Sequence, residues 1–256
     1  MKKPLVSLLV GNNYFQTEKE AILTVRLGKV YVNNQKIIKP KTLVDTQSIV
    51  KIKEQKRYVS RAGLKIEAAL DNFKINPNGK ICLDIGAAEG GFTDCLLQKG
   101  ANFVYALEKG KNQLKVKLKD NPRVTDLGGK DFADLPQIST QTIDIVVVDV
   151  TYAKLEHVLS VLSSKIHENT QILALIKPRF ETSAYHILHT TEFYYQLLAN
   201  IVKNANQYEW YIKDIIPSPI KGQNGRNSEF LALFERTLPN NTECLEKASK
   251  EVVNLS

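Results

Sequence analysis

The stretch D-I-G-A-A-E-G-G-F-T-D, residues 84–94, decides the fold of this chain. The apolar run before it, from Lys80 to Ile85, is typical of a buried strand, and the run from Phe92 to Gln98 is typical of a helix. A turn of small residues between strand and helix leaves the backbone N–H groups of the helix N-terminus free beside the sheet. The stretch therefore predicts a strand–turn–helix unit with a ligand site at the carboxyl end of the strand.

The alternation of strands and helices continues to residue 234. Expected strands cover residues 80–85, 103–107, 124–127, 143–150, 172–176, 208–215 and 230–234, and expected helices cover 92–98, 111–118, 155–163 and 191–205. This alternation of strands and helices predicts βαβ units in a mostly parallel sheet with helices on both faces. Only a loop separates the last two strands, so we expect them to pair antiparallel at one edge. The predicted fold class is α/β and Rossmann-like.

The first fifty residues have a different pattern, of short helices followed by β structure. Thr17 to Glu20 form a capping box that starts a helix ending at Gly28, and Asn33-Asn34 joins two short strands. We expect Ser60 to cap the first helix of the larger domain. The expected organisation is a small α+β module over 1–53, a linker over 54–60, a larger domain over 61–236 and a peripheral tail over 237–256.

The positive charge of the chain is concentrated near the N-terminus. The whole chain carries +8, and residues 1–80 hold 16 Lys and Arg against 6 Asp and Glu. Such asymmetry fits a nucleic-acid-binding module, because contacts with phosphates release counterions, but a basic surface that serves solubility fits equally well. The side chains expected to follow nucleic-acid phosphates are Arg26, Lys29, Lys36, Lys39 and Lys41.

Composition excludes several classes of protein. Hydrophobic residues make up 43% of the chain and charged residues 24%, which is ordinary for a globular protein. No apolar run approaches the roughly 18 residues of a membrane-spanning helix, and no cleavage site follows the short apolar stretch near the N-terminus. Three widely spaced cysteines fit a reducing compartment, so we expect a cytoplasmic protein. No metal is expected, since His186, His189 and Glu192 lack further ligands at suitable spacing.

Acidic residues stand at the ends of the first two strands of the larger domain. Asp84 and Glu108 occupy these positions, and Glu89 lies in the turn, which disfavours a pyrophosphate and suits a cationic ligand. S-adenosylmethionine carries an ammonium and a sulfonium but no phosphate, and Glu108 can accept its ribose hydroxyls. A turn whose glycines serve packing alone is the alternative. The expected cofactor-binding residues are Asp84, Gly86, Ala87, Gly90, Gly91, Phe92, Glu108, Asp131, Phe132 and Asp149.

Asp131 and Phe132 are the residues expected to contact the adenine of the cofactor. They follow the third strand and are expected to bracket the adenine, with Asp131 accepting from its amino group. A cap on a short helix is an equally ordinary role for Asp131.

Four further charges are predicted to converge on the same side of the sheet. Asp149 and Lys177 each end a strand, and the carboxyl ends of neighbouring parallel strands lie over one crevice. Glu229 precedes the final, reversed strand, so it lies on that side as well. Lys65, on the helix before the first strand, is the fourth candidate. Each alone fits a cap or a surface charge, whereas all four together indicate a catalytic site.

Several motifs carry a resemblance to a known family. The string from Arg26 to Ile37 resembles the alpha-L RNA-binding module first known in a ribosomal protein. The larger domain resembles the hemolysin A, or TlyA, family, which joins this module to an FtsJ-like methyltransferase domain. The matching motifs are R-Y-V-S-R-A-G-L-K (57–65), L-D-I-G-A-A-E-G-G-F-T-D-C-L-L (83–97), V-V-D-V (147–150), I-K-P-R-F-E (176–181) and S-P-I-K-G-Q-N-G-R-N-S-E-F (218–230).

The resemblance implies 2′-O-methylation of ribosomal RNA with S-adenosylmethionine as the cofactor. The family's catalytic tetrad falls on Lys65, Asp149, Lys177 and Glu229. A ribose hydroxyl is a poor nucleophile, so Lys177 is expected to act as general base, with Asp149 holding it. Glu229 is expected to orient Lys65, which fixes the 2′-oxygen. Residues 182–190 depart from the family, because T-S-A-Y-H-I-L-H-T replaces a glycine-rich, basic stretch.

Two other functions remain open at this point. A noncatalytic RNA-binding or ribosome-assembly protein with this fold has little use for all four charges. A small-molecule O-methyltransferase has little use for the basic module. The expected partners are ribosomal RNA or ribosomal subunits, and no amphipathic or spanning segment suggests a membrane.

Overall fold

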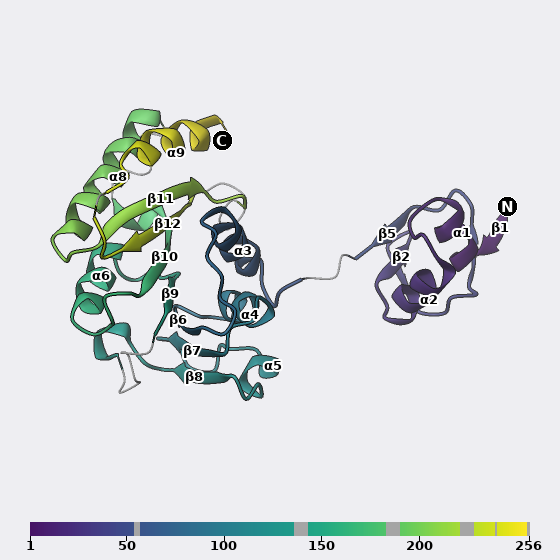
Figure 1. Ribbon diagram of the computed structural model, residues 1–256. Coiled ribbons are helices and arrows are strands. Elements are labelled where there is room, and N and C mark those ends of the chain that lie inside the picture. Colours follow the sequence, from purple (N-terminus) through teal and green to yellow (C-terminus); the bar gives the residue numbers. More distant parts are fainter. Residues whose placement is uncertain (54–56, 136–142, 183–189, 221–227, 239, 255–256) are drawn as a thin grey trace. The chain divides into compact units, whose positions relative to one another are not determined.

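A computed structural model of the protein describes residues 1–53, 57–135, 143–182, 190–220, 228–238 and 240–254. By its internal contacts the chain divides into two compact units, Met1–Lys56 and Arg57–Ser256 (Figure 1).

The first unit is a small α+β module with its own core. Thr17 and Glu20 form the expected capping box, and Asn33 and Asn34 adopt the positive φ angles that a tight hairpin turn requires. The side chains of Leu5, Leu9, Ala21, Val25 and Val30 are fully buried. Its elements are β1 (Lys2–Pro4), α1 (Leu5–Gly11), α2 (Glu18–Arg26), β2 (Val30–Val32), β3 (Gln35–Ile37), β4 (Leu43–Asp45) and β5 (Val50–Ile52). The strands form a β3-β2-β5 sheet and a β1-β4 pair.

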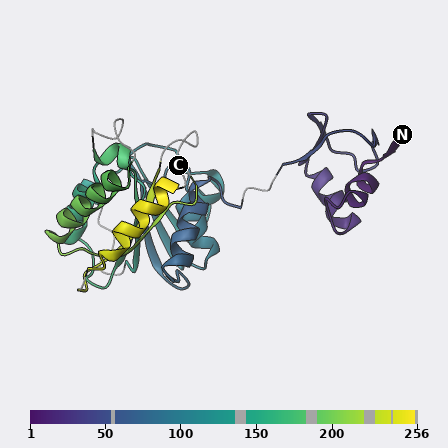
Figure 2. The same ribbon diagram turned by 90° about the horizontal axis from the view of Figure 1, so that it is seen from above.

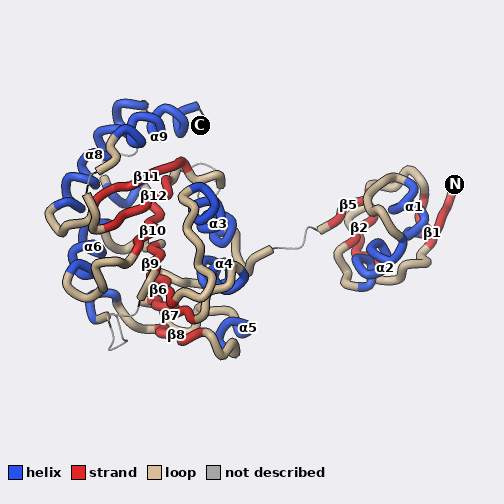
Figure 3. Tube along the Cα trace, in the orientation of Figure 1, coloured by secondary structure: helices blue, strands red, loops and turns tan. Residues whose placement is uncertain are grey.

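The second unit is built on a seven-stranded sheet in the order β11-β12-β10-β9-β6-β7-β8 (Figure 3). The strands are β6 (Ile81–Ile85), β7 (Phe103–Glu108), β8 (Val124–Gly128), β9 (Ile145–Val148), β10 (Gln171–Ile176), β11 (Tyr211–Pro217) and β12 (Phe230–Glu235). All are parallel except β12, which runs antiparallel to both β10 and β11. The Rossmann-like α/β class with an antiparallel pair at one edge is therefore confirmed, and the reversed strand lies one place inside that edge.

Helices cover both faces of this sheet (Figure 2). One face carries α3 (Ala62–Asn72), α4 (Gly91–Gln98) and the short α5 (Val116–Lys119), and the other carries α6 (Leu155–Ser163), α8 (Thr191–Asn206) and α9 (Glu243–Asn254). The one-turn helices η1 (Phe132–Asp134) and α7 (Pro178–Glu181) follow β8 and β10. The largest fully buried side chain is Trp210, which donates through Nε1 to the carbonyl of Leu159 at 3.2 Å. Among the described residues no helix is both long and apolar enough to cross a membrane.

Three local expectations were wrong. The helix expected over 111–118 begins only at Val116, in the short α5. Ser60 does not cap α3, because the helix begins at Ala62 after Arg61 and has no side-chain cap. Ser60 instead lies against Gly91, where a Cβ atom would come within 2.2 Å of its hydroxyl oxygen. Residues 57–60, expected in the linker, belong to the second unit, and Tyr58 is buried there; 54–56 lie outside the described residues.

The C-terminal segment also differs from the expected peripheral tail. Helix α9 packs against α8 and β11 and buries Cys244, Leu245, Ala248 and Val252 in the larger core of the second unit. Its apolar residues recur at spacings of three and four, so one side of the helix is continuously apolar. The surface that covers this apolar side, on α8 and β11, is formed only in the folded chain.

We expect Leu245→Ala to destabilise the second unit by about 2–5 kcal/mol, because it leaves a cavity in a packed core. Leu245 is 2% exposed. Urea unfolding followed by circular dichroism measures the loss. The control is Lys247→Ala, an exposed position on the same helix. Equal midpoints for the two variants would show that α9 is peripheral after all.

Candidate active site

The turn between β6 and α4 is shaped by two glycines. Gly86 has a φ of +87°, and a Cβ atom there would lie 2.4 Å from the carbonyl oxygen of Asp149. Gly90 has a φ of +93°, and a Cβ atom there would lie 2.3 Å from Leu118. Only glycine fits such positions, because both the conformation and the space exclude a side chain. The turn thus lies directly against the end of β9 and against α5.

Asp84 is fully buried at the end of β6. Its Oδ2 accepts hydrogen bonds from the backbone N and the hydroxyl of Thr93, at 2.9 and 2.7 Å, which fastens the first turn of α4 to the strand. Its Oδ1 has no hydrogen-bond partner in the described structure. Burial, with smaller contributions from the nearby carboxylates of Asp149 and Glu108, raises the pKa of Asp84 to about 7, although the hydrogen bonds from Thr93 lower it. A cluster of buried negative charge with an unpaired oxygen favours a cationic ligand.

Glu108, at the end of β7, holds the same turn. Its two carboxylate oxygens accept from the backbone N–H groups of Ala88 at 3.0 Å and Gly110 at 2.8 Å. Ala88 has a positive φ of 47°, so this hydrogen bond stabilises a backbone conformation that is otherwise unfavourable. Each carboxylate oxygen retains a further lone pair. The expected contact with ribose hydroxyls remains a prediction.

Asp131 caps the one-turn helix η1, the alternative that the sequence left open. It accepts from the N–H of Ala133 at 3.1 Å, and it forms an ion pair with Lys109 at 2.9 Å. The hydrogen bond from Lys109 lowers the pKa of Asp131. Phe132 is 1% exposed and stacks on Tyr152, with ring centroids 5.8 Å apart. Lys109 and Tyr152, which the sequence did not single out, therefore stand beside two of the expected adenine contacts.

The four charges predicted to converge form two ion pairs. Lys65 pairs with Glu229, and both side chains are almost completely buried. Lys177 pairs with Asp149, and both are largely buried. The register of β12 against β10 brings Lys177 and Glu229 to the same edge, because β12 starts opposite the end of β10, with Phe230 beside Ile176. Lys177 and Glu229 are the next residues outward from that pair, so both lie at one edge of the sheet.

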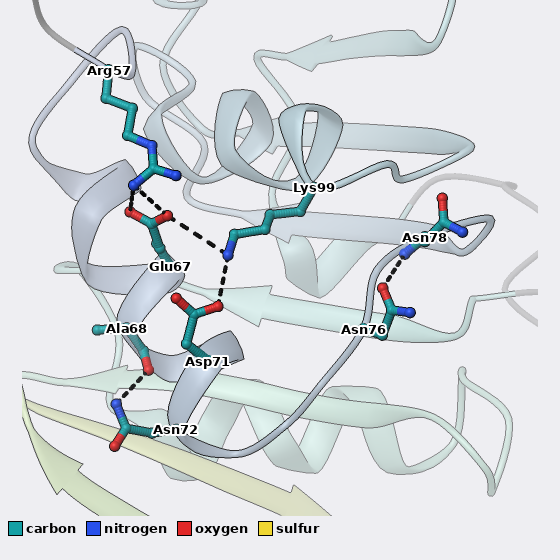
Figure 4. A network of polar contacts seen from close by, with 8 residues as sticks. All are labelled: Arg57, Glu67, Ala68, Asp71, Asn72, Asn76, Asn78 and Lys99. Carbon is teal, nitrogen blue, oxygen red and sulfur yellow. Dashed lines mark hydrogen bonds and ion pairs between the residues drawn. The ribbon is translucent and has the colours of Figure 1, made fainter.

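Polar contacts fix the helix that carries Lys65. Arg57 contacts the carboxylate of Glu67 at 2.7 and 2.8 Å, and Lys99, the C-cap of α4, contacts Glu67 at 3.6 Å and Asp71 at 2.6 Å (Figure 4). Exposed ion pairs contribute little singly, but this network joins α3, α4 and the segment before α3. These contacts fix the position of α3, and with it Lys65, relative to α4.

The remaining expected site residues are also placed by the structure. Ala87, Gly91 and Phe92 are buried around the turn. In the first unit, Arg26, Lys36, Lys39 and Lys41 are exposed and Lys29 is partly buried. A Cβ atom at Gly28 would lie 2.2 Å from Cε of Lys36, so this lysine crosses the end of α2. Among the described residues no group of three or more potential metal ligands occurs; His186 and His189 lie outside them.

The sheet order, the glycine turn and the acidic strand ends define a Rossmann-like methyltransferase. Residues 58–236 match the FtsJ-like methyltransferases. Hemolysin A of Brachyspira hyodysenteriae is 34% identical to this chain over 88% of the chain and 96% of its own length. The 16S/23S rRNA (cytidine-2′-O)-methyltransferase TlyA of Mycobacterium tuberculosis is 30% identical over 90% of this chain and 88% of its own.

A solved structure agrees with these relatives. A candidate hemolysin from Streptococcus thermophilus has a TM-score of 0.72 and 31% identity, covering 99% of this chain and 96% of its own. The chain belongs to the FtsJ-like methyltransferase family and, within it, to the hemolysin A/TlyA group. The family assignment made from the sequence motifs is confirmed.

We expect Asp84→Asn to raise the melting temperature at pH 8. The pKa of Asp84 is about 7 in the folded chain against an ordinary 3.8, so its contribution to stability falls as the pH rises through this window. The amide keeps an oxygen for Thr93 but carries no buried charge. Differential scanning calorimetry at several pH values should show a gain that shrinks as the pH falls toward 3.8. Asp120→Asn, at an exposed position, is the control; a gain that did not vary with pH would contradict this explanation.

Proposed function

We propose that this protein is an S-adenosylmethionine-dependent 2′-O-methyltransferase of ribosomal RNA. The proposal rests on two ion pairs at one edge of the sheet, Lys65–Glu229 and Lys177–Asp149. They lie on the side of the glycine turn, in a chain of the FtsJ-like methyltransferase family.

The residues around the turn fit S-adenosylmethionine. The unpaired, buried Oδ1 of Asp84 and the neighbouring carboxylates of Glu108 and Asp149 supply negative charge for its ammonium and sulfonium. Glu108 would hold the ribose diol, and Asp131 and Phe132 would hold the adenine. Gly86, Ala87, Gly90, Gly91 and Phe92 would shape the surface that the cofactor contacts. When bound, the cofactor supplies an electrophilic methyl group.

The chain's own residues prepare the ribose hydroxyl for attack on that methyl group. Nζ of Lys177, once neutral, takes the 2′-hydroxyl proton as the oxygen attacks. Asp149 holds Nζ in place and stabilises the ammonium that results. Lys65 keeps its charge beside Glu229 and donates a hydrogen bond that directs the 2′-oxygen. The two carboxylates thus position two lysines, of which Lys177 accepts a proton and Lys65 donates a hydrogen bond.

The choice of ribosomal RNA rests on the first unit and on the relatives. Exposed Arg26, Lys36, Lys39 and Lys41, with Lys29 beside them, suit a phosphate backbone. The TlyA protein of Mycobacterium tuberculosis is named as a 16S/23S rRNA (cytidine-2′-O)-methyltransferase. A ribosomal substrate makes the cytoplasm the expected compartment.

A direct assay separates this proposal from the alternatives. The protein is incubated with methyl-labelled S-adenosylmethionine and either ribosomal subunits, total RNA or a pool of small metabolites. Label in RNA that resists alkaline cleavage at one position supports 2′-O-methylation. Label in small molecules alone would favour the small-molecule enzyme, and no label in any pool would favour the noncatalytic reading.

We expect Lys177→Ala to lower the rate of methyl transfer by about 10²–10⁴-fold, because it removes the proton acceptor. Cofactor affinity, measured by calorimetry, should stay close to that of the wild type. Lys177→Arg should not restore the rate, since a guanidinium does not give up its proton. Near-normal methylation by Lys177→Ala would remove Lys177 from the mechanism.

We expect joint replacement of Lys36, Lys39 and Lys41 by alanine to weaken RNA binding and to flatten its dependence on salt. Fluorescence anisotropy over a salt series measures both quantities. The control replaces Lys203, Lys247 and Lys250, three exposed lysines of α8 and α9, and removes the same charge. If both triple variants bind RNA alike, the first unit has another task.

A further inference from the structure

Most residues of the motif I-K-P-R-F-E (176–181) pack in the core or form hydrogen bonds or ion pairs within the fold. Pro178 is buried at the first position of α7. Phe180 is partly buried, and its N–H donates to the carbonyl of Lys177 at 2.9 Å. Glu181 accepts from the N–H of Leu155, the first residue of α6, at 3.1 and 3.4 Å. Its carboxyl is partly buried and its pKa is raised by burial to about 6. These contacts fix α7 between β10 and α6.

Arg179 is the exception. Its side chain is exposed, and it forms no ion pair with any carboxylate of the described residues. Its guanidinium lies over the ring of Phe180, 4.6 Å from the centroid. A cation in this position is held by the ring's negative face, which restricts a side chain that is otherwise mobile. The fold therefore restricts Arg179 while leaving its charge without a carboxylate partner among the described residues.

The same ring also lies beside Lys177. Nζ of Lys177 is 6.0 Å from the centroid of Phe180. Both cations therefore border the same aromatic ring. Lys177 is already engaged by Asp149, whereas Arg179 has no carboxylate partner among the described residues.

We propose that Arg179 binds a backbone phosphate of the RNA strand whose 2′-hydroxyl faces Lys177. This inference rests on the proposed function and deepens it. A guanidinium is planar, permanently charged and able to donate two parallel hydrogen bonds to a phosphate. Because the Phe180 ring already restricts the side chain, less conformational freedom is lost on binding. A phosphate contact carries no base information, so Arg179 sets the position of the target ribose and not the sequence around it.

The first test is Arg179→Ala in the full-length protein, with ribosomal RNA as substrate. We expect RNA affinity to fall about tenfold, which corresponds to about 1.4 kcal/mol, with a matching rise in the KM for RNA. The slope of log affinity against log salt should decrease by about 0.7–0.9, the value for one lost phosphate contact. S-adenosylmethionine affinity should be unchanged. Lys203→Ala, an exposed cation on α8, is the control and should leave the salt slope unaltered.

Two further variants separate charge from geometry. Arg179→Lys keeps the charge but not the paired donors, so its RNA affinity should lie between those of Arg179→Ala and the wild type. Phe180→Leu keeps an apolar side chain but removes the ring, and should weaken RNA binding with the salt slope retained. If the wild type methylates RNA, an unchanged salt slope in Arg179→Ala would overturn the inference. A loss of S-adenosylmethionine affinity without a change in the salt slope would overturn it as well. Absence of RNA binding by the wild type itself would overturn the proposed function as well.

Discussion

The buried ion pair between Lys65 and Glu229 joins the beginning of the second unit to its last strand. Lys65 lies on α3, ahead of the first strand, and Glu229 lies just before β12. Removing one partner of such a pair leaves an uncompensated buried charge, at a typical cost of about 3–5 kcal/mol. The pair is satisfied only if α3 packs on the correct face and β12 runs in the reversed direction. The geometry of the whole edge, including Lys177 and Asp149, depends on these two conditions.

The sheet and the convergence of the four charges were predictable because they follow from short-range rules. Strand–helix alternation implies a parallel sheet, and residues at the carboxyl ends of parallel strands gather at one edge. Asp149 and Lys177 needed only these rules. Glu229 needed in addition the inference that a loop connection reverses the last strand. The pairing of the charges agrees with these rules, whereas their catalytic roles still await the methylation assays.

Other features depended on tertiary contacts that a linear pattern does not contain. Ser60 has the chemistry of a helix cap, yet in the folded chain its hydroxyl lies against Gly91 of α4. The apolar side of helix α9 is present in the sequence, but the surface on α8 and β11 that covers it exists only in the folded chain. Asp84 and Glu108 were expected to face a ligand, and the structure gives both a second task, since they hold the turn between β6 and α4. Lys109 was not foreseen because its partners, Asp131 and Tyr152, follow other strands.

The separate cores of the two units have a thermodynamic consequence. Residues such as Leu9 and Val25 are buried within the first unit alone, and the second unit buries a different and much larger set. Cooperative unfolding is a property of a single core, and a chain with two cores need not melt in one step. A single free energy of unfolding describes this protein only where both units unfold together. The ratio of the calorimetric to the van't Hoff enthalpy of the intact chain reports how far the two units share one transition.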